Sequence, residues 1–523
     1  MANFENEFTW GKAISKNTTD YFHEQFEKGI DEAKKEFGKK YPIIINGREI
    51  YSDDNFYVNS PSDTKLLIAE FPKATISDTN DAISSAKNAF EEWSNTPYQK
   101  RVDIFRECAN YFSSRKYFLA AIMTFENGKN RIEAMGDVDE AIDFMRFYAL
   151  LLEKNDGFCK QTNHPNPNEK TQIVMKPYGV WGIISPFNFP SAIAIGMSTG
   201  ALITGNTAVL KPASAAPLSS FYFAKFLSSK IPNGAINFVT GSGSTVGKTL
   251  IESEYVDGIA FTGSRDVGMK GFHEFTKITT KPFISEMGGK NPVIVTKNAD
   301  LEKASNGVVN AAFGFGGQKC SACSRVYVQN EIADQFITKL VEKTKKLKIG
   351  MPWKKENFLG PIINFDAIKK FTEVSNLAKQ DGKILVGGSV IKTPDFENGF
   401  FVEPTIVEKL PENHKLMQEE LFLPFLCVQR FDNFDDAIKL ANQSEYGLTA
   451  GIFSEDEKQL EKFFSKIQSG VVYANRSASA TTAALVSSQP FVGWKYSGTT
   501  GKGAGGEYYL QQFLRTQTQT RCD

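Results

Sequence analysis

The sequence has few of the features that mark a secreted or a membrane protein. Its six cysteines are scattered over 523 residues and form no disulfide framework, so a reducing compartment, the cytoplasm by default, is expected. No apolar run of about eighteen residues is free of charged or turn residues, so no transmembrane helix is expected. The start, MANFENEFTW, lacks a basic segment followed by an apolar block and does not resemble a secretory signal.

Neither sign of charge is in excess. Sixty basic residues balance sixty acidic ones, so the chain has no net field that would attract nucleic acid or an anionic membrane, and neither is expected as a partner. Metal ligands are also scarce. Besides Cys320 and Cys323 there is no second ligand pair at short spacing, and the chain has only four histidines, so no metal site is expected.

What is present is the composition of a folded globular protein, with 41% hydrophobic and 23% charged residues. The length predicts about two to four domains. Up to about residue 157 the apolar spacing predicts helices over residues 17–39, 82–93, 101–115 and 137–152. A hairpin with an Asn46-Gly47 turn is predicted after the first helix. This part is interpreted as scaffold, without chemistry of its own.

From Tyr178 onward, short apolar runs alternate with helical ones. This alternation is the signature of an α/β fold, in which crossover helices connect the strands of a parallel sheet. Such a sheet binds ligands beyond the carboxyl ends of its strands. The predicted strand ends carry turns at residues 185–190, 211–214, 241–247 and 262–264.

Two of these turns suit a phosphate group. Gly263 and Ser264 end a strand and open a helix, so free backbone N–H groups and the helix dipole favour an anion there. Gly241, Gly243 and Gly247 loosely resemble a dinucleotide fingerprint, although an ordinary turn is the alternative. The adjacent Lys211 can neutralise a phosphate, hold a ribose or simply be solvated.

The stretch FGFGGQKCSACSR, from Phe313 to Arg325, contains the candidate nucleophile. Small, flexible residues precede Cys320, which suits a strained turn that presents a thiol. From this stretch alone an inert core cysteine or a redox pair with Cys323 stays open. Upstream, Glu286 precedes a second apolar strand and is far enough away to return to the same cleft. Its alternative is a surface glutamate before a turn.

A second α/β unit follows Cys320, with a helix over residues 334–346, a helix over residues 434–442 and a strand over residues 448–454. The tail, FLRTQTQTR, alternates polar β-formers. We therefore expect an exposed strand that pairs with another segment, such as one from a second subunit.

Several separated motifs together resemble the NAD(P)-dependent aldehyde dehydrogenase superfamily, from about Tyr41 to the C-terminus. They occur in the family's order and spacing: GVWGIISPFNFP, AVLKPASAAP, AFTGSRDVG, EMGGKNPVIV, GFGGQKCSACSR, MQEELFLPF and QPFVGWKYSGT. Within the superfamily, FGFGGQKCSACSR and SGTTGKGAGGEYYL are most similar to 1-pyrroline-5-carboxylate dehydrogenases, which oxidise glutamate γ-semialdehyde.

The resemblance implies roles for particular residues. Cys320 is the expected nucleophile, Asn188 the amide that holds the oxyanion, and Glu286 the base that activates water. The residues expected at the cofactor are Ser185, Pro186, Phe187, Lys211, Ser214, Gly243, Gly247, Gly263, Ser264, Glu420 and Phe422. The residues expected at the substrate are Phe187, Ser321, Ala483 and Ala484.

Two departures from the family pattern bear on specificity. The substrate loop, residues 482–489, lacks the glycines expected near Ala483 and Ser487. Another semialdehyde, or glyceraldehyde, is therefore the alternative substrate. Ser214 stands where NAD-preferring members commonly have a glutamate that repels a 2′-phosphate. NADP is therefore expected as a cofactor, with or without NAD.

The resemblance also implies the domain organisation. A Rossmann-type cofactor domain is expected over residues 1–157 and 175–285, and an α/β catalytic domain over 286–495. A small β-extension over residues 158–174 and 505–523 is expected to join subunits into a homodimer or homotetramer. A CoA-acylating enzyme is disfavoured because Glu286 is present. A non-enzymatic relative is the remaining alternative.

Overall fold

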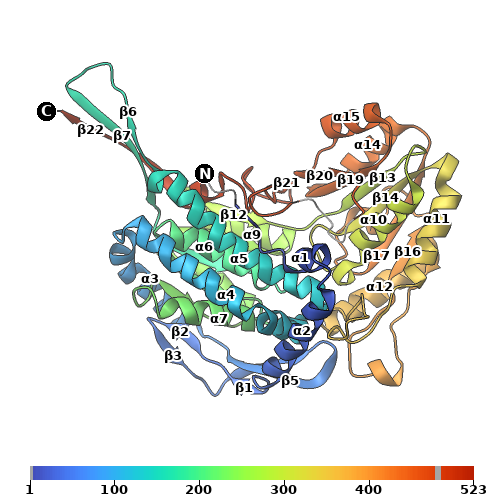
Figure 1. Ribbon diagram of the computed structural model, residues 1–523, viewed down its shortest axis with the longest axis horizontal. Helices are drawn as coiled ribbons and strands as arrows, with labels where there is room; N and C mark the ends of the chain where they lie inside the picture. Colours follow the sequence, from blue (N-terminus) through green and yellow to red (C-terminus); the bar gives the residue numbers. More distant parts are fainter. Residues whose placement is uncertain (1–3, 478–483, 523) are drawn as a thin grey trace.

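The computed structural model describes residues 4–477 and 484–522 of the chain. Two seven-stranded sheets form the centres of two lobes, and a three-stranded sheet projects away from them (Figure 1). The strand orders of the two large sheets are β12-β11-β8-β9-β10-β2-β3 and β15-β16-β17-β14-β13-β19-β20. The predicted α/β class is confirmed by this arrangement of mostly parallel strands and crossover helices.

The first sheet has five parallel strands whose carboxyl ends lie along one edge. They are β12 (Phe283–Glu286), β11 (Gly258–Thr262), β8 (Val180–Ile184), β9 (Thr207–Lys211) and β10 (Ile236–Phe238). The helices that connect or follow them are α6 (Ala192–Ile203), α7 (Leu218–Ser228), α8 (Lys248–Glu252) and α9 (Arg265–Phe275). Nearly every residue of these strands is buried, which explains their continuous apolar runs.

The predicted hairpin extends this sheet. Strands β2 (Ile43–Ile45) and β3 (Arg48–Ile50) pair antiparallel, and β2 also pairs with β10. Asn46 and Gly47 have φ angles of 54° and 72°. Positive φ at both central residues is the requirement of a type I′ turn, so the Asn-Gly prediction is confirmed.

The predicted N-terminal helices are present with different bounds. Helix α2 (Thr19–Lys34) ends earlier than predicted, whereas α4 (Tyr98–Asn127) and α5 (Arg131–Lys154) are longer. A capping box of Thr75 and Asp78 starts α3 (Ile76–Ser94). Gly128, at φ 83°, ends α4, and the Asn130 side chain caps α5. Helices α4 and α5 lie side by side in Figure 1 and contribute to one large apolar core with α6.

The second sheet contains the other predicted α/β unit. Its strands are β13 (Asn291–Val295), β14 (Cys323–Gln329), β15 (Lys383–Val386), β16 (Thr405–Glu408), β17 (Phe425–Phe431), β19 (Thr449–Phe453) and β20 (Val471–Ala474). Four of its helices are α10 (Leu301–Phe313), α11 (Asn330–Lys345), α14 (Phe434–Asn442) and α15 (Glu457–Lys466). Helix α14 has its predicted bounds, and α11 begins four residues before its predicted start.

The projecting sheet consists of β6 (Cys159–Thr162), β7 (Glu169–Pro177) and β22 (Leu514–Cys522), at the upper left of Figure 1. The tail is a strand, as predicted. It pairs antiparallel with β7 of its own chain, from Leu514 opposite Pro177 to Cys522 opposite Glu169. Nearly all β22 residues after Leu514 remain exposed.

Within residues 4–477 and 484–522, no helix is long and apolar enough to cross a membrane. The same part of the chain has no group of three metal-ligating side chains.

Candidate active site

Cys320 follows a left-handed turn at the end of α10. Phe315, Gly316 and Gly317 have φ angles of 50°, 61° and 67°. A Cβ on Gly317 would lie 2.2 Å from the carbonyl oxygen of Leu423, so only glycine fits at this position. The turn delivers Cys320 to the start of β14, where Asn291 Nδ2 donates to the Cys320 carbonyl oxygen at 2.7 Å. The glycine-rich run therefore forms the turn before Cys320 that the sequence predicted.

A cavity of about 310 Å³ opens above this turn. Cys320 and Ser321, just before β14, line it, and Glu286 lines it from the end of β12. Helix α5 supplies further lining residues, among them Glu133 and Glu140. The predicted nucleophile and the predicted base thus face the same space, although Glu286 ends a strand of the first sheet and Cys320 precedes a strand of the second.

The Glu286 carboxyl group is buried, and its Oε2 has no hydrogen-bond partner among the described residues. Burial raises the pKa of Glu286 well above its usual value, although a hydrogen bond from the Gly493 backbone opposes this effect. The Glu286 main chain is fixed because its carbonyl accepts from Gly263 N at 3.2 Å. This raised pKa makes the Glu286 carboxylate a stronger base than an exposed glutamate, as suits a general base.

Asn188 is buried next to the peptide that precedes the nucleophile. Its Nδ2 donates to the carbonyl oxygen of Gln318 at 3.0 Å. Gln318 is itself held, because its Oε1 accepts from Ile363 N at 2.9 Å. A side-chain amide has two N–H groups, so Asn188 retains a donor beyond the Gln318 contact. The structure thus brings all three predicted catalytic residues together.

The surroundings of Cys320 favour the neutral thiol over the thiolate. Burial raises its pKa well above the usual range, and the negative charges of Glu420 and Glu286 raise it further. Hydrogen bonds from the backbone N–H groups of Ser321 and Cys320 act in the opposite direction. Formation of the thiolate therefore needs a proton acceptor nearby, and Glu286 lines the same cavity.

Most predicted cofactor residues lie at the carboxyl edge of the first sheet. Ser185 follows β8, Lys211 ends β9, and Gly263 follows β11. Neighbouring strands align them: Ile184 is opposite Lys211, and Ser185 N donates to the Lys211 carbonyl at 3.1 Å. Five residues of the turn after β10, from Gly243 to Gly247, form one π-helical turn before α8. The sequence had predicted only a glycine-rich turn there.

This edge has polar groups that a nucleotide can use. Lys211 is buried, and burial lowers its pKa to about 8. Within the described part of the chain, its Nζ donates only to Pro212 O, at 2.9 Å. The Ser185 hydroxyl is buried without a hydrogen-bond partner in the described structure. Ser264 precedes α9, and its side chain makes no capping hydrogen bond. A buried cation, an unpaired hydroxyl and an uncapped helix N-terminus fit the ribose and phosphate oxygens of NAD(P).

Ser214 Oγ donates to the Gly241 carbonyl at 3.1 Å, so it faces the neighbouring turn. The remaining predicted cofactor residues come from the opposite side. Glu420 Oε1 accepts from Gly289 N at 2.9 Å, and burial raises the Glu420 pKa to about 7. Phe422, at φ 59°, packs edge-on against Phe187 with ring centroids 5.9 Å apart.

Phe187 was expected to contact both cofactor and substrate. Its ring packs on Phe422. The described residues that line the cavity include Phe189 but not Phe187. Pro186 lies between Ser185 and Phe187 in the same turn. The substrate contact of Phe187 therefore stays a prediction, and Phe189 is the phenylalanine of this turn that lines the cavity.

Two of the other three residues predicted at the substrate belong to the described part of the chain. Ser321 and Ala484 line the cavity, whereas Ala483 lies outside the described part of the chain. Ser487, where the family pattern has glycine, has φ 71°. Its backbone N–H donates to the Gly505 carbonyl at 3.0 Å, so this donor is already used.

Three features of the cavity were missed from the sequence. Lys319, directly before Cys320, forms a partly buried ion pair with Glu133 at 2.7 Å. Glu140 lines the cavity without a hydrogen bond or ion pair in the described structure, and burial raises its pKa to about 8. Phe8 and Trp10, from the N-terminus, also line it. Of these residues, only Lys319 could have been expected near the site from the sequence, because it directly precedes the nucleophile.

Comparisons with known proteins agree with this geometry. Residues 50–519 match the family model described as the aldehyde dehydrogenase family. A 1-pyrroline-5-carboxylate dehydrogenase from Geobacillus sp. (strain WCH70) is 39% identical over 500 residues, covering 94% of this chain and 95% of that protein.

Two solved structures are similar over the whole fold. The 1-pyrroline-5-carboxylate dehydrogenase from Thermus with bound NAD has a TM-score of 0.92 and 31% identity, covering 100% of both chains. Proline utilization A from Bdellovibrio bacteriovorus has a TM-score of 0.93 and 34% identity, covering 99% of this chain. This chain spans about half, 53%, of that longer protein.

Proposed function

Since this chain belongs to the aldehyde dehydrogenase family, we propose that it oxidises L-glutamate γ-semialdehyde, the open form of 1-pyrroline-5-carboxylate, to glutamate. The chain is an oxidoreductase that converts an aldehyde to a carboxylic acid. The observation that carries the proposal is the shared cavity of Cys320 and Glu286, with Asn188 bonded to the peptide before the nucleophile.

The cofactor proposed is NADP or NAD, held by Lys211, Ser214 and Ser264 on one side and by Glu420 and Phe422 on the other. When bound, it supplies the acceptor for the hydride that leaves the substrate carbon. The buried Lys211 ammonium and the α9 N-terminus neutralise phosphate charge. The Ser214 hydroxyl accommodates a 2′-phosphate because it carries no negative charge.

Within the protein, Cys320 loses its proton to Glu286 or to water, and its sulfur adds to the aldehyde carbon. The second N–H of the Asn188 amide and the Cys320 backbone N–H donate to the oxyanion. After oxidation a thioester joins the substrate to Cys320. Glu286 releases to solvent any proton it took from Cys320 and then takes a proton from water. The resulting hydroxide attacks the thioester, and the carboxylic acid leaves as the Cys320 thiolate is restored.

The substrate end supports an amino-acid semialdehyde. The Glu140 carboxyl lines the cavity without a partner in the described structure. An ammonium group beside it would favour its ionised form and pair with it. Ser321 and Ala484 line the same space. The relative from Geobacillus sp. is named for 1-pyrroline-5-carboxylate, which is the cyclic form of this semialdehyde.

A second candidate substrate class, another semialdehyde or glyceraldehyde, is favoured by one observation. Ser487 occupies a position with φ 71° where glycine would be unstrained, and its backbone N–H is bonded to Gly505. A substrate without an α-carboxylate would not need that donor. Assembly into a homodimer or homotetramer through the projecting sheet is also proposed, because β22 leaves an exposed edge.

The proposal is tested with a panel of glutamate γ-semialdehyde, succinate semialdehyde and glyceraldehyde, each with NAD and with NADP. The highest kcat/KM is expected for glutamate γ-semialdehyde. Cys320→Ala is expected to abolish aldehyde-dependent NAD(P)H formation. Cys323→Ala is the matched control, because Cys323 is a buried thiol bonded to the Arg325 carbonyl. An equal loss of NAD(P)H formation in both variants would contradict the mechanism. A higher kcat/KM for glyceraldehyde than for glutamate γ-semialdehyde would contradict the proposed substrate.

A further inference from the structure

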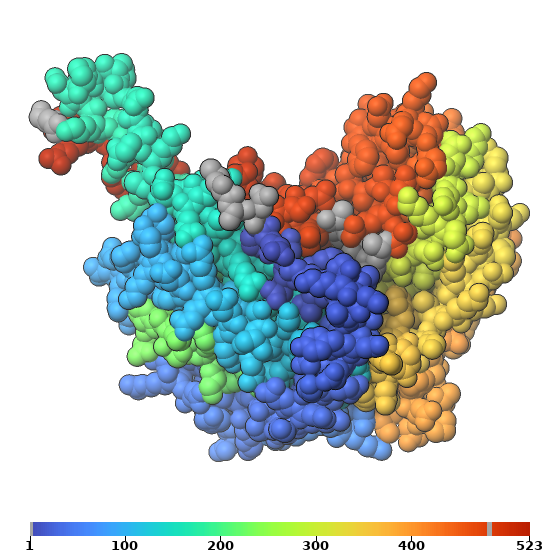
Figure 2. Space-filling view, viewed as in Figure 1, coloured from blue at the N-terminus to red at the C-terminus, as the bar shows by residue number. Residues whose placement is uncertain are grey.

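Residues Phe4–Ser15, called here the N-terminal strap, cross the surface beside the cavity. The strap consists of an extended part and helix α1 (Thr9–Ser15). Phe8 and Trp10 line the same cavity as Cys320. Figure 2 shows the N-terminal segment in dark blue on the surface between the two lobes. The strap lies outside the part of the chain that matches the family model, residues 50–519.

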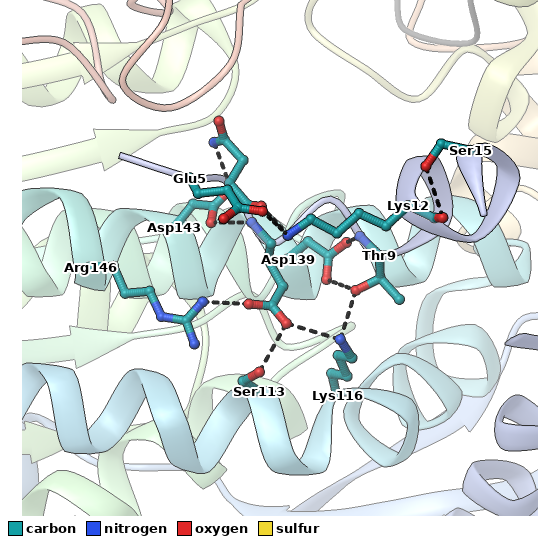
Figure 3. A network of polar contacts seen from close by, with 11 residues as sticks. Glu5, Thr9, Lys12, Ser15, Ser113, Lys116, Asp139, Asp143 and Arg146 are labelled. Atoms are coloured by element: carbon teal, nitrogen blue, oxygen red, sulfur yellow. Dashed lines mark hydrogen bonds and ion pairs between the residues drawn. The ribbon is translucent and has the colours of Figure 1, made fainter. Parts of the chain in front are cut away.

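Helix α5 anchors the strap through two carboxylates (Figure 3). Asp139 accepts from Thr9 N at 2.6 Å and from Thr9 Oγ1 at 2.7 Å. Asp143 accepts from Glu7 N and from Asn6 Nδ2, both at 2.8 Å. Asp139 also lines the cavity and directly precedes Glu140. The same turn of α5 therefore holds the strap and forms part of the substrate site.

Glu7 fixes the strap to α4 and α5 from the other side. Its carboxylate accepts from Ser113 Oγ and from Lys116 Nζ, both at 2.9 Å, and also pairs with Arg146. Although burial opposes ionisation, these cationic partners lower the Glu7 pKa to about 2. Glu7 is therefore ionised at neutral pH, whereas burial raises the pKa of Asp139 to about 7 and that of Asp143 to about 6.

Asn6 connects the strap to the predicted substrate loop. Its Nδ2 donates to Asp143 and also to the Val486 carbonyl, at 3.0 Å. Val486 is two residues from Ala484, which lines the cavity. The strap thus joins α5 to the segment that closes the substrate end.

Each of the two aromatic residues contacts a neighbouring group of the chain. Phe8 has φ 41° and ψ 50°, and its ring covers Gly11, where a Cβ would lie 1.9 Å from the ring. The Phe8 side chain is 57% exposed, so it lies where the cavity meets solvent. Trp10 packs edge-on against Phe22, with centroids 4.9 Å apart. Neither ring can move aside without breaking these contacts.

We propose that the N-terminal strap is the outer wall of the aldehyde cavity and that Phe8 and Trp10 limit the length of the aldehydes that the enzyme accepts. Short chains, such as the semialdehyde of the proposed function on which this inference rests, fit inside the wall. Long apolar aldehydes meet the two rings before their carbonyl carbon reaches Cys320. Asn6 and Glu7 act as positioning residues, because they hold the strap without lining the cavity.

The test compares kcat/KM for linear aldehydes from propanal to octanal in the full-length wild type, Phe8→Ala and Trp10→Ala. In both variants the ratio of octanal to propanal efficiency is expected to rise by at least about tenfold, mainly through a lower KM for octanal. Trp10→Phe keeps an aromatic ring and is expected to stay near the wild-type ratio. Ile14→Ala is the matched control, because Ile14 lies on the same helix, is 57% exposed and does not line the cavity.

The outcomes separate this inference from the proposed function. A wild type that oxidises none of these aldehydes and no semialdehyde would overturn the proposed function. A wild type that is active, with both alanine variants keeping its chain-length profile, would overturn the strap as a wall. Melting temperatures identify any variant that fails to fold, and Phe8→Ala, which removes a largely exposed ring, then carries the test.

Discussion

The Asn188 side chain donates to the carbonyl oxygen of Gln318 at 3.0 Å, two residues before Cys320. Its other N–H is available to an oxyanion formed at the nucleophile. Replacing Asn188 with alanine is expected to lower kcat by about 10²–10³-fold, because one oxyanion donor is lost, with a smaller change in KM. Steady-state kinetics with a saturating aldehyde measure both constants.

The matched control is Asn206→Ala. Asn206 is also a buried amide that donates to a backbone carbonyl, that of Phe513 at 2.9 Å, but its partners Gly179, Thr204 and Phe513 lie outside the turn before Cys320. Both variants are expected to lower the melting temperature by a few degrees, because each loses a buried hydrogen bond. A similar fall in kcat for the two variants would show that Asn188 acts only through stability.

Much of the first sheet was predictable because local signals agree with the final contacts. The Asn46-Gly47 turn needs positive φ twice, and the strands after Tyr178 are buried on both faces and read as continuous apolar runs. The gathering of Ser185, Lys211 and Gly263 at one edge follows from parallel topology alone. Family motifs, whose order reflects the same topology, identified Asn188, Glu286 and Cys320 as candidate catalytic residues.

Ser214 stands beside the turn after β10, with its hydroxyl bonded to the Gly241 carbonyl. Ser214→Glu is expected to lower kcat/KM with NADP by at least about tenfold, because two negative charges would then be adjacent. The ratio of NAD to NADP efficiency should rise correspondingly. Initial-rate kinetics with each cofactor at fixed aldehyde concentration give the ratio.

Ser214→Ala separates charge from lost hydrogen bonding. It removes the hydroxyl but adds no charge, so a much smaller change in the cofactor ratio is expected. If Ser214→Ala and Ser214→Glu changed the ratio equally, repulsion of a 2′-phosphate would not be the cause.

The outer part of the site was not predictable, because it depends on contacts between distant segments. Helix α5 was interpreted as scaffold, since Glu133, Asp139 and Glu140 have the spacing of ordinary polar helix residues. Their role appears only when the N-terminal strap and Lys319 pack against them. The apolar spacing of the N-terminal region likewise gave no indication that Phe8 would line a cavity with Cys320.

Ser487 has φ 71°, a conformation that favours glycine. Ser487→Gly is expected to raise the free energy of unfolding by about 1 kcal/mol, because the left-handed strain of a residue with a Cβ is removed. The melting temperature should rise by about 1–2 °C in a chain of this size. Ser488→Gly is the adjacent control without positive φ and is expected to lower the melting temperature instead. A fall in both variants would contradict the strain at Ser487.

Glu286 predicts a pH dependence of thioester hydrolysis. Burial raises its pKa well above the usual value, so the carboxyl is protonated at acidic pH and cannot take a proton from water. The rate of acyl-enzyme hydrolysis should therefore rise with pH through this raised pKa and then level off. In Glu286→Gln the hydrolysis should be slower by about 10²–10⁴-fold, and its rate should no longer rise with pH.

Stopped-flow measurements between pH 5 and 9 test this expectation. Glu286→Gln should give a burst of NAD(P)H followed by slow turnover. An unchanged pH profile in Glu286→Gln would assign the base to another group, and Glu140, which lines the same cavity, would be the next to substitute.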